Sequence, residues 1–247
     1  MANPAVRTPL YILYLDAHHL GDDIFLNDFA QRFNQSTTGE PPSLILHGSG
    51  EKVERTLESQ GYFPERKNGV LNVQEPEQVR LVERAVRETN QKLVATLTDE
   101  VVPTVGIQGV DRSLLQLDEE GTVIVSRLGW VEALLQQRVL PVVSALVKHP
   151  EEGRVREVYA AEAAVALAEA FERFETTVVF FTTSGQSGIA DAEGIRDEIA
   201  LDALTDDGPV PDMAAARDIA QAGVPVLVSH LDGVFDGEAP TGTRVQP

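Results

Sequence analysis

SLILHGSGEKVERTLESQG, residues 43–61, is the stretch that decides the fold class. It predicts a buried strand over Ser43–His47, a tight turn at Gly48-Ser49-Gly50, and a helix over Glu51–Gln60 that ends with Gly61 in the C′ position. A buried strand, a short glycine turn and an amphipathic helix in this order form the building unit of parallel α/β sheets. We therefore expect an α/β fold.

The same alternation of short apolar runs and amphipathic stretches continues on both sides of this unit. Further strands are predicted over Leu10–Leu15, Thr104–Gly109, Leu140–Val147, Thr177–Thr182 and Val224–Ser229, and helices over Pro76–Leu97, Trp130–Arg138, Tyr159–Phe174 and Asp212–Ala222. Leu114–Leu117 and Thr122–Val125 indicate a hairpin, and Thr243–Val245 a strand that returns to the sheet. The pattern favours one largely parallel sheet.

Two of these helices have clear apolar faces. Asp22 or Asp23 can cap a helix whose predicted apolar stripe consists of Ile24, Phe25, Phe29 and Phe33. In the helix over Pro76–Leu97, one face carries Val79, Val82, Val86, Asn90, Leu93 and Leu97.

The composition restricts the classes of protein that the chain can represent. Its 247 residues include 39 acidic and 20 basic side chains and no cysteine, which gives a formal net charge of -19. This charge disfavours nucleic-acid binding, and the missing thiols rule out disulfides and thiolate metal sites. With no apolar run long enough to span a membrane and no signal-peptide pattern, we expect a cytoplasmic protein. Because only Lys52, Lys67, Lys92 and Lys148 are lysines, we also expect a halophilic source.

The glycine turn after Ser43–His47 permits two interpretations. Backbone N–H groups of Gly48, Ser49 and Gly50, together with the first turn of the following helix, could cradle a carboxylate or a phosphate. The same glycines could equally serve the steric needs of a tight strand-to-helix turn. The spacing alone leaves both interpretations open.

A second polar loop follows the strand over Leu10–Leu15. Asp16, His18, His19 and Asp22 crowd it at the carboxyl end of a strand, where open α/β sheets bind ligands. The favoured interpretation is an acidic loop with a helix cap and no metal, and the alternative is a metal site built from these four residues.

The motifs resemble those of acetylglutamate kinase, in the amino-acid kinase family. LHGSGEKV resembles the V-H-G-G-G substrate loop, TNQKLVATL the N-K-x-L-V helix, TVGIQGVDRSLL the A-V-G-L-S-G-x-D-G segment, SGIADAEG the S-G-I-L-D-G-K-G segment, and DGPVPDMAAARDIAQAGV the G-G-M-x-x-K helix. The resemblance implies a three-layer αβα sandwich with a mainly parallel open sheet of about eight strands. It implies an N-terminal amino-acid-substrate and dimerisation lobe over residues 1–150 and a C-terminal nucleotide-type lobe over 151–247 that share one sheet.

The resemblance also shows which positions have lost their expected residues. Tyr14 stands where the family has the lysine of K-x-G-G, Asp212 where it has the catalytic lysine, and Glu193 where it has the lysine of D-G-K-G. Ala161 replaces the aspartate of N-A-D, Tyr159 its asparagine, and Leu71 the arginine that clamps the substrate carboxylate. Phosphoryl transfer needs cations around the phosphates, so these changes predict weak or lost activity.

The resemblance thus leads to competing functions. The first is ATP-dependent phosphorylation of the side-chain carboxylate of N-acetyl-L-glutamate in arginine biosynthesis, with ATP and Mg²⁺ as cofactors. The second is a non-catalytic pseudokinase that binds a small acidic metabolite or serves as a regulatory subunit, and a third is a different substrate on the same fold. Substrate contacts are expected from Gly48, Ser49, Gly50, Leu71 and Tyr159, and nucleotide contacts from Ser184, Ser187, Gly188, Asp191 and Glu193. A homodimer, or a pair with a related kinase subunit, would form through helices such as Pro76–Leu97.

Overall fold

The computed structural model describes residues 7–35, 42–67, 69–149, 153–192, 194–205, 208–237 and 239–246. Two sequence predictions fall outside these ranges: the nucleotide contact expected from Glu193, and the boundary between the two lobes at residues 150 and 151. Within the described ranges, none of the helices is long and apolar enough to cross a membrane.

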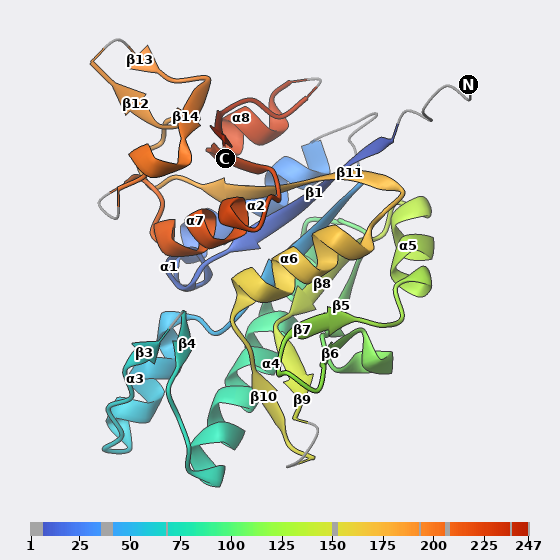
Figure 1. Cartoon of the computed structure of the whole chain (residues 1–247), viewed down its shortest axis with the longest axis vertical. Coiled ribbons are helices and arrows are strands. Elements are labelled where there is room, and N and C mark those ends of the chain that lie inside the picture. Colours follow the sequence, from blue (N-terminus) through green and yellow to red (C-terminus); the bar gives the residue numbers. More distant parts are fainter. Residues whose placement is uncertain are drawn as a thin grey trace.

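An open eight-stranded sheet forms the middle layer of the molecule (Figure 1). Its strands, in spatial order, are β14 (Glu198–Ala200), β16 (Thr243–Gln246), β15 (Val226–Ser229), β11 (Phe174–Phe181), β1 (Thr8–Leu15), β2 (Ser43–His47), β8 (Leu140–Ser144) and β5 (Thr104–Gln108). The neighbours from β15 to β5 are parallel, whereas β16 runs antiparallel to β15. The predicted mainly parallel sheet and the returning terminal strand are both confirmed.

Helices cover both faces of the sheet, as the alternating side chains of β1 require. Ile12 and Tyr14 point into a core shared with α5 (Gly129–Gln136), α6 (Ala160–Ala170) and α7 (Met213–Gln221). Leu13 and Leu15 point into the opposite core, which is closed by α2 (Asp23–Gln35), α4 (Pro76–Asp99) and α8 (Leu231–Phe235). The structure also contains the helix α3 (Glu51–Ser59) and the short helices α1 (Ala17–Gly21), η1 (Asp111–Ser113) and η2 (Leu201–Ala203). This arrangement confirms the predicted three-layer fold.

In the described parts of the chain, four short hairpins lie outside the central sheet. They pair β3 (Arg66–Lys67) with β4 (Val70–Leu71), β6 (Leu115–Leu117) with β7 (Val123–Val125), β9 (Leu146–Lys148) with β10 (Val155–Glu157), and β12 (Ala190–Asp191) with β13 (Gly194–Ile195). The single strand predicted over Leu140–Val147 is therefore wrong, because the chain leaves the sheet after Ser144 and pairs with β10 instead. This departure brings β10 beside the glycine turn.

The predicted helix cap is confirmed at Asp22, whose carboxylate accepts hydrogen bonds from the backbone N–H groups of Ile24 (2.9 Å) and Phe25 (3.1 Å). Ile24 itself is wrong as a member of the buried stripe, because it faces solvent with 83% of its surface exposed, while Phe29 is buried. The long helix α4 has the predicted face, which is buried within this chain at Val82, Val86, Asn90, Leu93 and Leu97. That face is therefore part of the core and is not free for a dimer contact.

Candidate functional site

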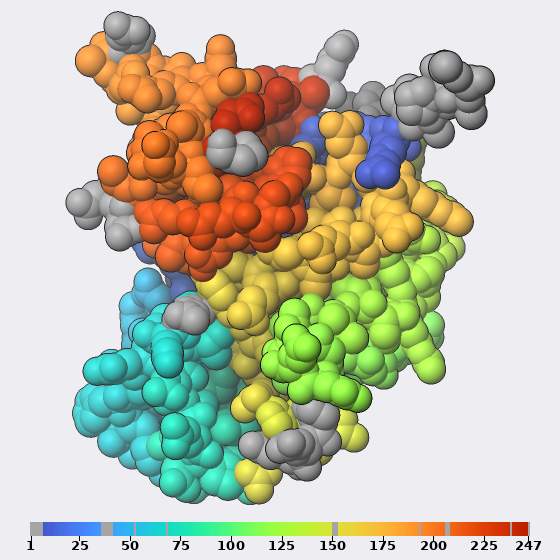
Figure 2. Space-filling model, in the orientation of Figure 1, coloured from blue at the N-terminus to red at the C-terminus, as the bar shows by residue number. Residues whose placement is uncertain are grey.

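A cavity of about 400 Å³ opens at the carboxyl ends of β1 and β2. Figure 2 shows a notch in this region, between the orange segment that contains α7 and the cyan segment that contains α3 and β3. The lining residues come from the β1–α1 loop, the glycine turn, the β3–β4 hairpin, the end of β10 and the segment before α7: Tyr14, Leu15, Asp16, Ala17, His18, Gly48, Ser49, Glu51, Glu54, Arg66, Gly69, Glu157, Ala160, Pro211 and Asp212. Ligands of open α/β sheets bind at this edge.

The glycine turn is shaped around a carboxylate of the chain itself. The backbone N–H of Ser49 donates a hydrogen bond to Oε1 of Glu157 at 2.5 Å. A Cβ atom at Gly48 would lie 2.6 Å from the same oxygen, so a larger residue would displace Glu157. At Gly50 a Cβ would lie 3.2 Å from the Cβ of Leu20. This geometry supports the steric interpretation of the turn, since the N–H of Ser49 already has an acceptor inside the protein.

Behind the turn, His47 and Asn90 form a buried polar network. Nδ1 of His47 lies 2.9 Å from the carbonyl oxygen of Gly48, and Nε2 lies 3.0 Å from the amide nitrogen of Asn90. The amide of Asn90 also donates to the carbonyl of Val142. Because a carbonyl only accepts, His47 carries its proton on Nδ1 and accepts at Nε2. Burial lowers the pKa of His47 to about 4, so the ring is neutral and holds the turn in place.

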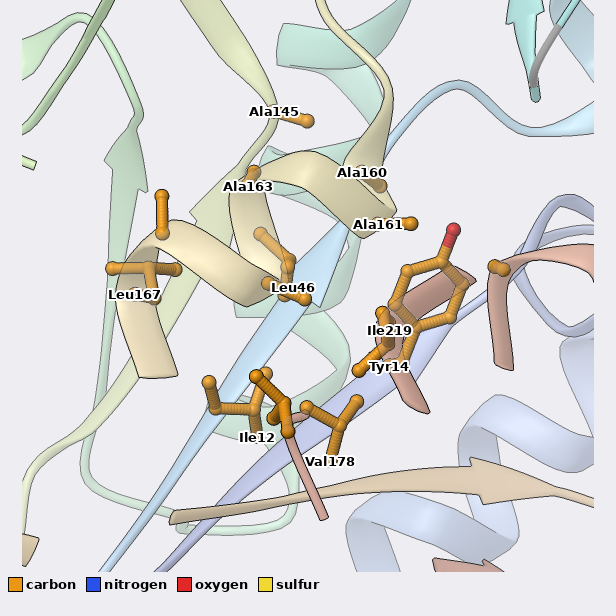
Figure 3. Packing of buried hydrophobic residues seen from close by; sticks show 14 of the residues in the cluster. Ile12, Tyr14, Leu46, Ala145, Ala160, Ala161, Ala163, Leu167, Val178 and Ile219 are labelled. Atoms are coloured by element: carbon orange, nitrogen blue, oxygen red, sulfur yellow. The ribbon is translucent and has the colours of Figure 1, made fainter. Parts of the chain in front are cut away.

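Tyr14 and Asp212, which stand at two expected lysine positions, contact each other directly. The hydroxyl of Tyr14 donates to Oδ2 of Asp212 at 3.1 Å, and Oδ1 of Asp212 accepts from the backbone N–H of Ala215 and caps α7. Burial raises the pKa of Asp212 and of Tyr14. Figure 3 shows the ring of Tyr14 between Ala161 and Ile219 with its hydroxyl at the edge of the apolar cluster. The two positions therefore hold a neutral donor and an acidic acceptor.

Glu157 and Arg66 are the two site residues that sequence reasoning missed. Burial raises the pKa of Glu157 to about 7, against the opposing effect of its hydrogen bonds with Ser49 and of the charge of Arg66. Arg66 donates from Nε to Glu54, from Nη1 to the carbonyl of Gly69 (2.7 Å), and from Nη2 to the carbonyl and hydroxyl of Ser49 (both 3.4 Å). Two features of the sequence could have indicated them. Glu157 stands directly before the apolar Val158, and Arg66 lies beside the turn at Gly69.

The remaining substrate positions do not line this cavity. Leu71 is buried in an apolar cluster with Val53, Leu57 and residues of α4. Ala161 is buried in the apolar core near Tyr14 (Figure 3). Tyr159 packs against the backbone of Gly69, where a Cβ would lie 2.5 Å from its ring. Of the predicted catalytic and substrate positions, Tyr14, Gly48, Ser49 and Asp212 are thus brought together at the cavity, beside Asp16 and His18 of the metal alternative.

The expected nucleotide contacts lie elsewhere, on the loop after β11. Ser184 and Asp191 are exposed, and Nε of Arg196 donates to the carboxylate of Asp191 at 2.5 Å. Gly188, with φ +144°, packs against Thr243 of the terminal strand, and Ser187 packs against Gly233 of α8. None of these four predicted residues lines the cavity beside Gly48.

The polar loop after β1 is used for local structure. Asp16 accepts from the backbone N–H (3.0 Å) and from Nδ1 (2.9 Å) of His19, and it caps α1. Nδ1 of His18 lies 3.9 Å from Oε1 of Glu51, and Asp22 caps α2. Across the described ranges, no group of three or more His, Asp or Glu side chains is placed to hold a metal ion. The four residues of the metal alternative are therefore not brought together.

The fold and the cavity define an α/β protein with a cavity at the carboxyl edge of its parallel strands, the edge at which open α/β sheets bind ligands. Residues 16–230 match the model of the amino acid kinase family, and the chain belongs to this family.

Solved structures with the same fold include several proteins of different activity. The smu.665 protein of Streptococcus mutans has a TM-score of 0.66 at 18% identity, over 96% of this chain and 98% of its own. N-acetylglutamate synthase from Neisseria gonorrhoeae has a TM-score of 0.69 at 16% identity, and the match covers 98% of this chain but 60% of the synthase. An isopentenyl phosphate kinase has a TM-score of 0.64 at 14% identity, over 96% of this chain and 100% of its own. At these identities the likeness establishes a shared fold.

Proposed function

We propose that this chain is a non-catalytic member of the amino acid kinase family that binds a small molecule in the cavity beside Gly48. The observation that carries the proposal is the hydrogen bond between Tyr14 and Asp212. In the family these two positions supply lysines to the phosphates, whereas here they supply a hydroxyl and a carboxylate. A carboxylate repels a phosphoryl group, and no compensating lysine lines the cavity among the described residues.

The organisation of the nucleotide side supports the same conclusion. Ser184 is exposed on the loop after β11, and Asp191 is exposed at the end of β12 and paired with Arg196. Arg196 is thus already paired with a carboxylate. ATP would need other cations to neutralise its phosphates, on a protein that is strongly acidic.

A kinase assay tests the proposal directly. Formation of ADP would be followed by a coupled assay with ATP, Mg²⁺ and N-acetyl-L-glutamate in molar KCl, beside a thermal-shift titration with ATP. We expect no turnover and no ATP-dependent stabilisation. A turnover number above roughly 1 s⁻¹, within the range of ordinary enzymes, would overturn the proposal.

Active phosphorylation of N-acetyl-L-glutamate is the second candidate. Family membership favours it, as does the fold shared with a synthase that was crystallised with coenzyme A and N-acetyl-glutamate. In that case ATP and Mg²⁺ would be the cofactors and arginine biosynthesis the pathway. A place in the cytoplasm, a halophilic source, and a homodimer or a related kinase subunit as partner remain predictions.

A further inference from the structure

Glu157 is a buried carboxylate at the cavity that lacks a full set of partners. Its side chain lines the cavity, its residue surface is 8% exposed, and Oε1 accepts from the backbone of Ser49. Its second oxygen, Oε2, is buried and has no hydrogen-bond partner among the residues that the structure describes. Buried carboxylate oxygens are normally satisfied, because leaving one without a donor is unfavourable. A donor from outside the chain would complete this group.

The cations around the cavity are already engaged. Among the lining residues that the structure describes, Arg66 is the one arginine or lysine, and each of its three nitrogens donates within the protein, to Glu54, Gly69 and Ser49. The guanidinium is thus held by Glu54 and by backbone carbonyls, and its positive charge is offset by the carboxylate of Glu54.

Carboxylates, in contrast, have acceptor capacity to spare. Each oxygen of Asp212 accepts one hydrogen bond, from Tyr14 or from Ala215, although an ionised carboxylate can accept about four in total. Asp16 and Glu51 add further negative charge to the same lining. After Arg66 is paired with Glu54, the lining therefore retains an excess of negative charge.

The cavity suits an organic cation better than a bare metal ion. No three acidic or histidine side chains in the described parts of the chain converge closely enough to hold a metal. A cavity of about 400 Å³ lies within the size range of sites for small organic ligands.

We infer that the cavity binds a small organic molecule through a primary ammonium group, with Glu157 and Asp212 as counter-charges. This inference rests on the proposed function, which places a ligand in the same cavity. An ammonium group offers three N–H donors, one of which would satisfy Oε2 of Glu157. The ligand class is the opposite of the acidic metabolite that the family resemblance suggests.

The energetic state of Glu157 supports this choice of ligand. Burial raises its pKa to about 7, so the ionised form is costly in the empty site. A cation beside it would favour the ionised form and recover that cost on binding. An acidic ligand would increase the cost.

Calorimetric titration of the full chain tests the inference with two matched probes, 1,4-diaminobutane and butanedioate. We expect the diamine to bind, and Glu157→Gln and Asp212→Asn each to weaken it at least roughly tenfold, by removing one charge-assisted hydrogen bond. Glu175→Gln is the matched control, because Glu175 is exposed at the opposite end of the sheet, beside Pro9. Circular dichroism would confirm that all variants are folded at the salt concentration used.

The outcomes separate the two proposals. Absence of diamine binding, tighter binding of butanedioate, or a diamine affinity unchanged in both site variants would overturn the ligand class. The proposed function would survive those results, since only turnover of ATP by the wild-type chain overturns it.

Discussion

The two halves of the carboxyl edge of the sheet differ in structure. Beside β1 and β2, the chain maintains a cavity with the buried polar residues His47 and Glu157 and the half-buried Asp212 in or behind its wall. Beside β11, Ser184 on the following loop and Asp191 in β12 are exposed, and Asp191 forms an ion pair with Arg196. The strands under both halves belong to one sheet. One sheet thus carries a cavity at one half of this edge and a surface ion pair beside the other half.

The largest expected effect comes from Glu157. Its pKa is raised from 4.5 to about 7 in the folded chain, so the folded state binds the proton more tightly between these values. The free energy of unfolding therefore falls as the pH rises from about 4.5 to about 7, by roughly 3 kcal/mol. Glu157→Gln should remove this loss and stabilise the chain by up to that amount at about pH 8, with little change near pH 4.

Urea unfolding of both proteins at these pH values measures the difference. His47, whose pKa is lowered to about 4, contributes the opposite slope, with stability gained as the pH rises from about 4 towards 6.5. It is present in both proteins, so its contribution cancels in the comparison. A variant no more stable than wild type at the higher pH would show that Glu157 is satisfied in the folded chain.

Gly48→Ala should have the next largest effect. The new Cβ would lie 2.6 Å from Oε1 of Glu157, so this buried side chain would have to move and would lose its hydrogen bond with Ser49. We expect a loss of roughly 1–3 kcal/mol in the free energy of unfolding. Gly21→Ala is the control, because no atom lies within 4 Å of the Cβ it would add. Equal effects of the two substitutions in chemical denaturation would contradict the close fit between Gly48 and Glu157.

The smallest effect is expected in the other half, at Arg196→Gln. The arginine side chain is 47% exposed, so its ion pair with Asp191 is screened by solvent and salt. The substitution should change the free energy of unfolding by less than about 1 kcal/mol, and less still in concentrated KCl. A loss as large as that of Gly48→Ala, measured in the same denaturation experiment, would remove the distinction between the two halves.

Local patterns were sufficient to predict most of the fold. The strand over Ser43–His47 and the helix that follows agree with the structure, because burial, the glycine turn and the C′ glycine all act within a few residues. Ile24 was misplaced because the stripe was extended to a first turn that projects into solvent. The strand from Leu140 was predicted too long, because its apolar run continues through β9 after the chain has left the sheet.

The site was less accessible to sequence reasoning because its contacts join distant parts of the chain. Ser49 and Glu157 are 108 residues apart, and Tyr14 and Asp212 are 198 apart. The resemblance to a family identified Tyr14, Ser49 and Asp212 individually, but not that Tyr14 and Asp212 bond to each other. Glu157 depends on the β9–β10 hairpin, and nothing in the local sequence predicts that this hairpin reaches the glycine turn.

The bond between Tyr14 and Asp212 also constrains how the lineage can change. Asp212 caps α7 through Ala215 and accepts from Tyr14, so Asp212→Lys alone would remove a helix cap and leave a buried hydroxyl without its acceptor. Tyr14→Lys alone would place an ammonium against Asp212, where the two charges neutralise each other. Neither single substitution creates a phosphate site, so a chain that carries one of them alone gains no phosphate binding. Two lysines at these positions would therefore require both substitutions together.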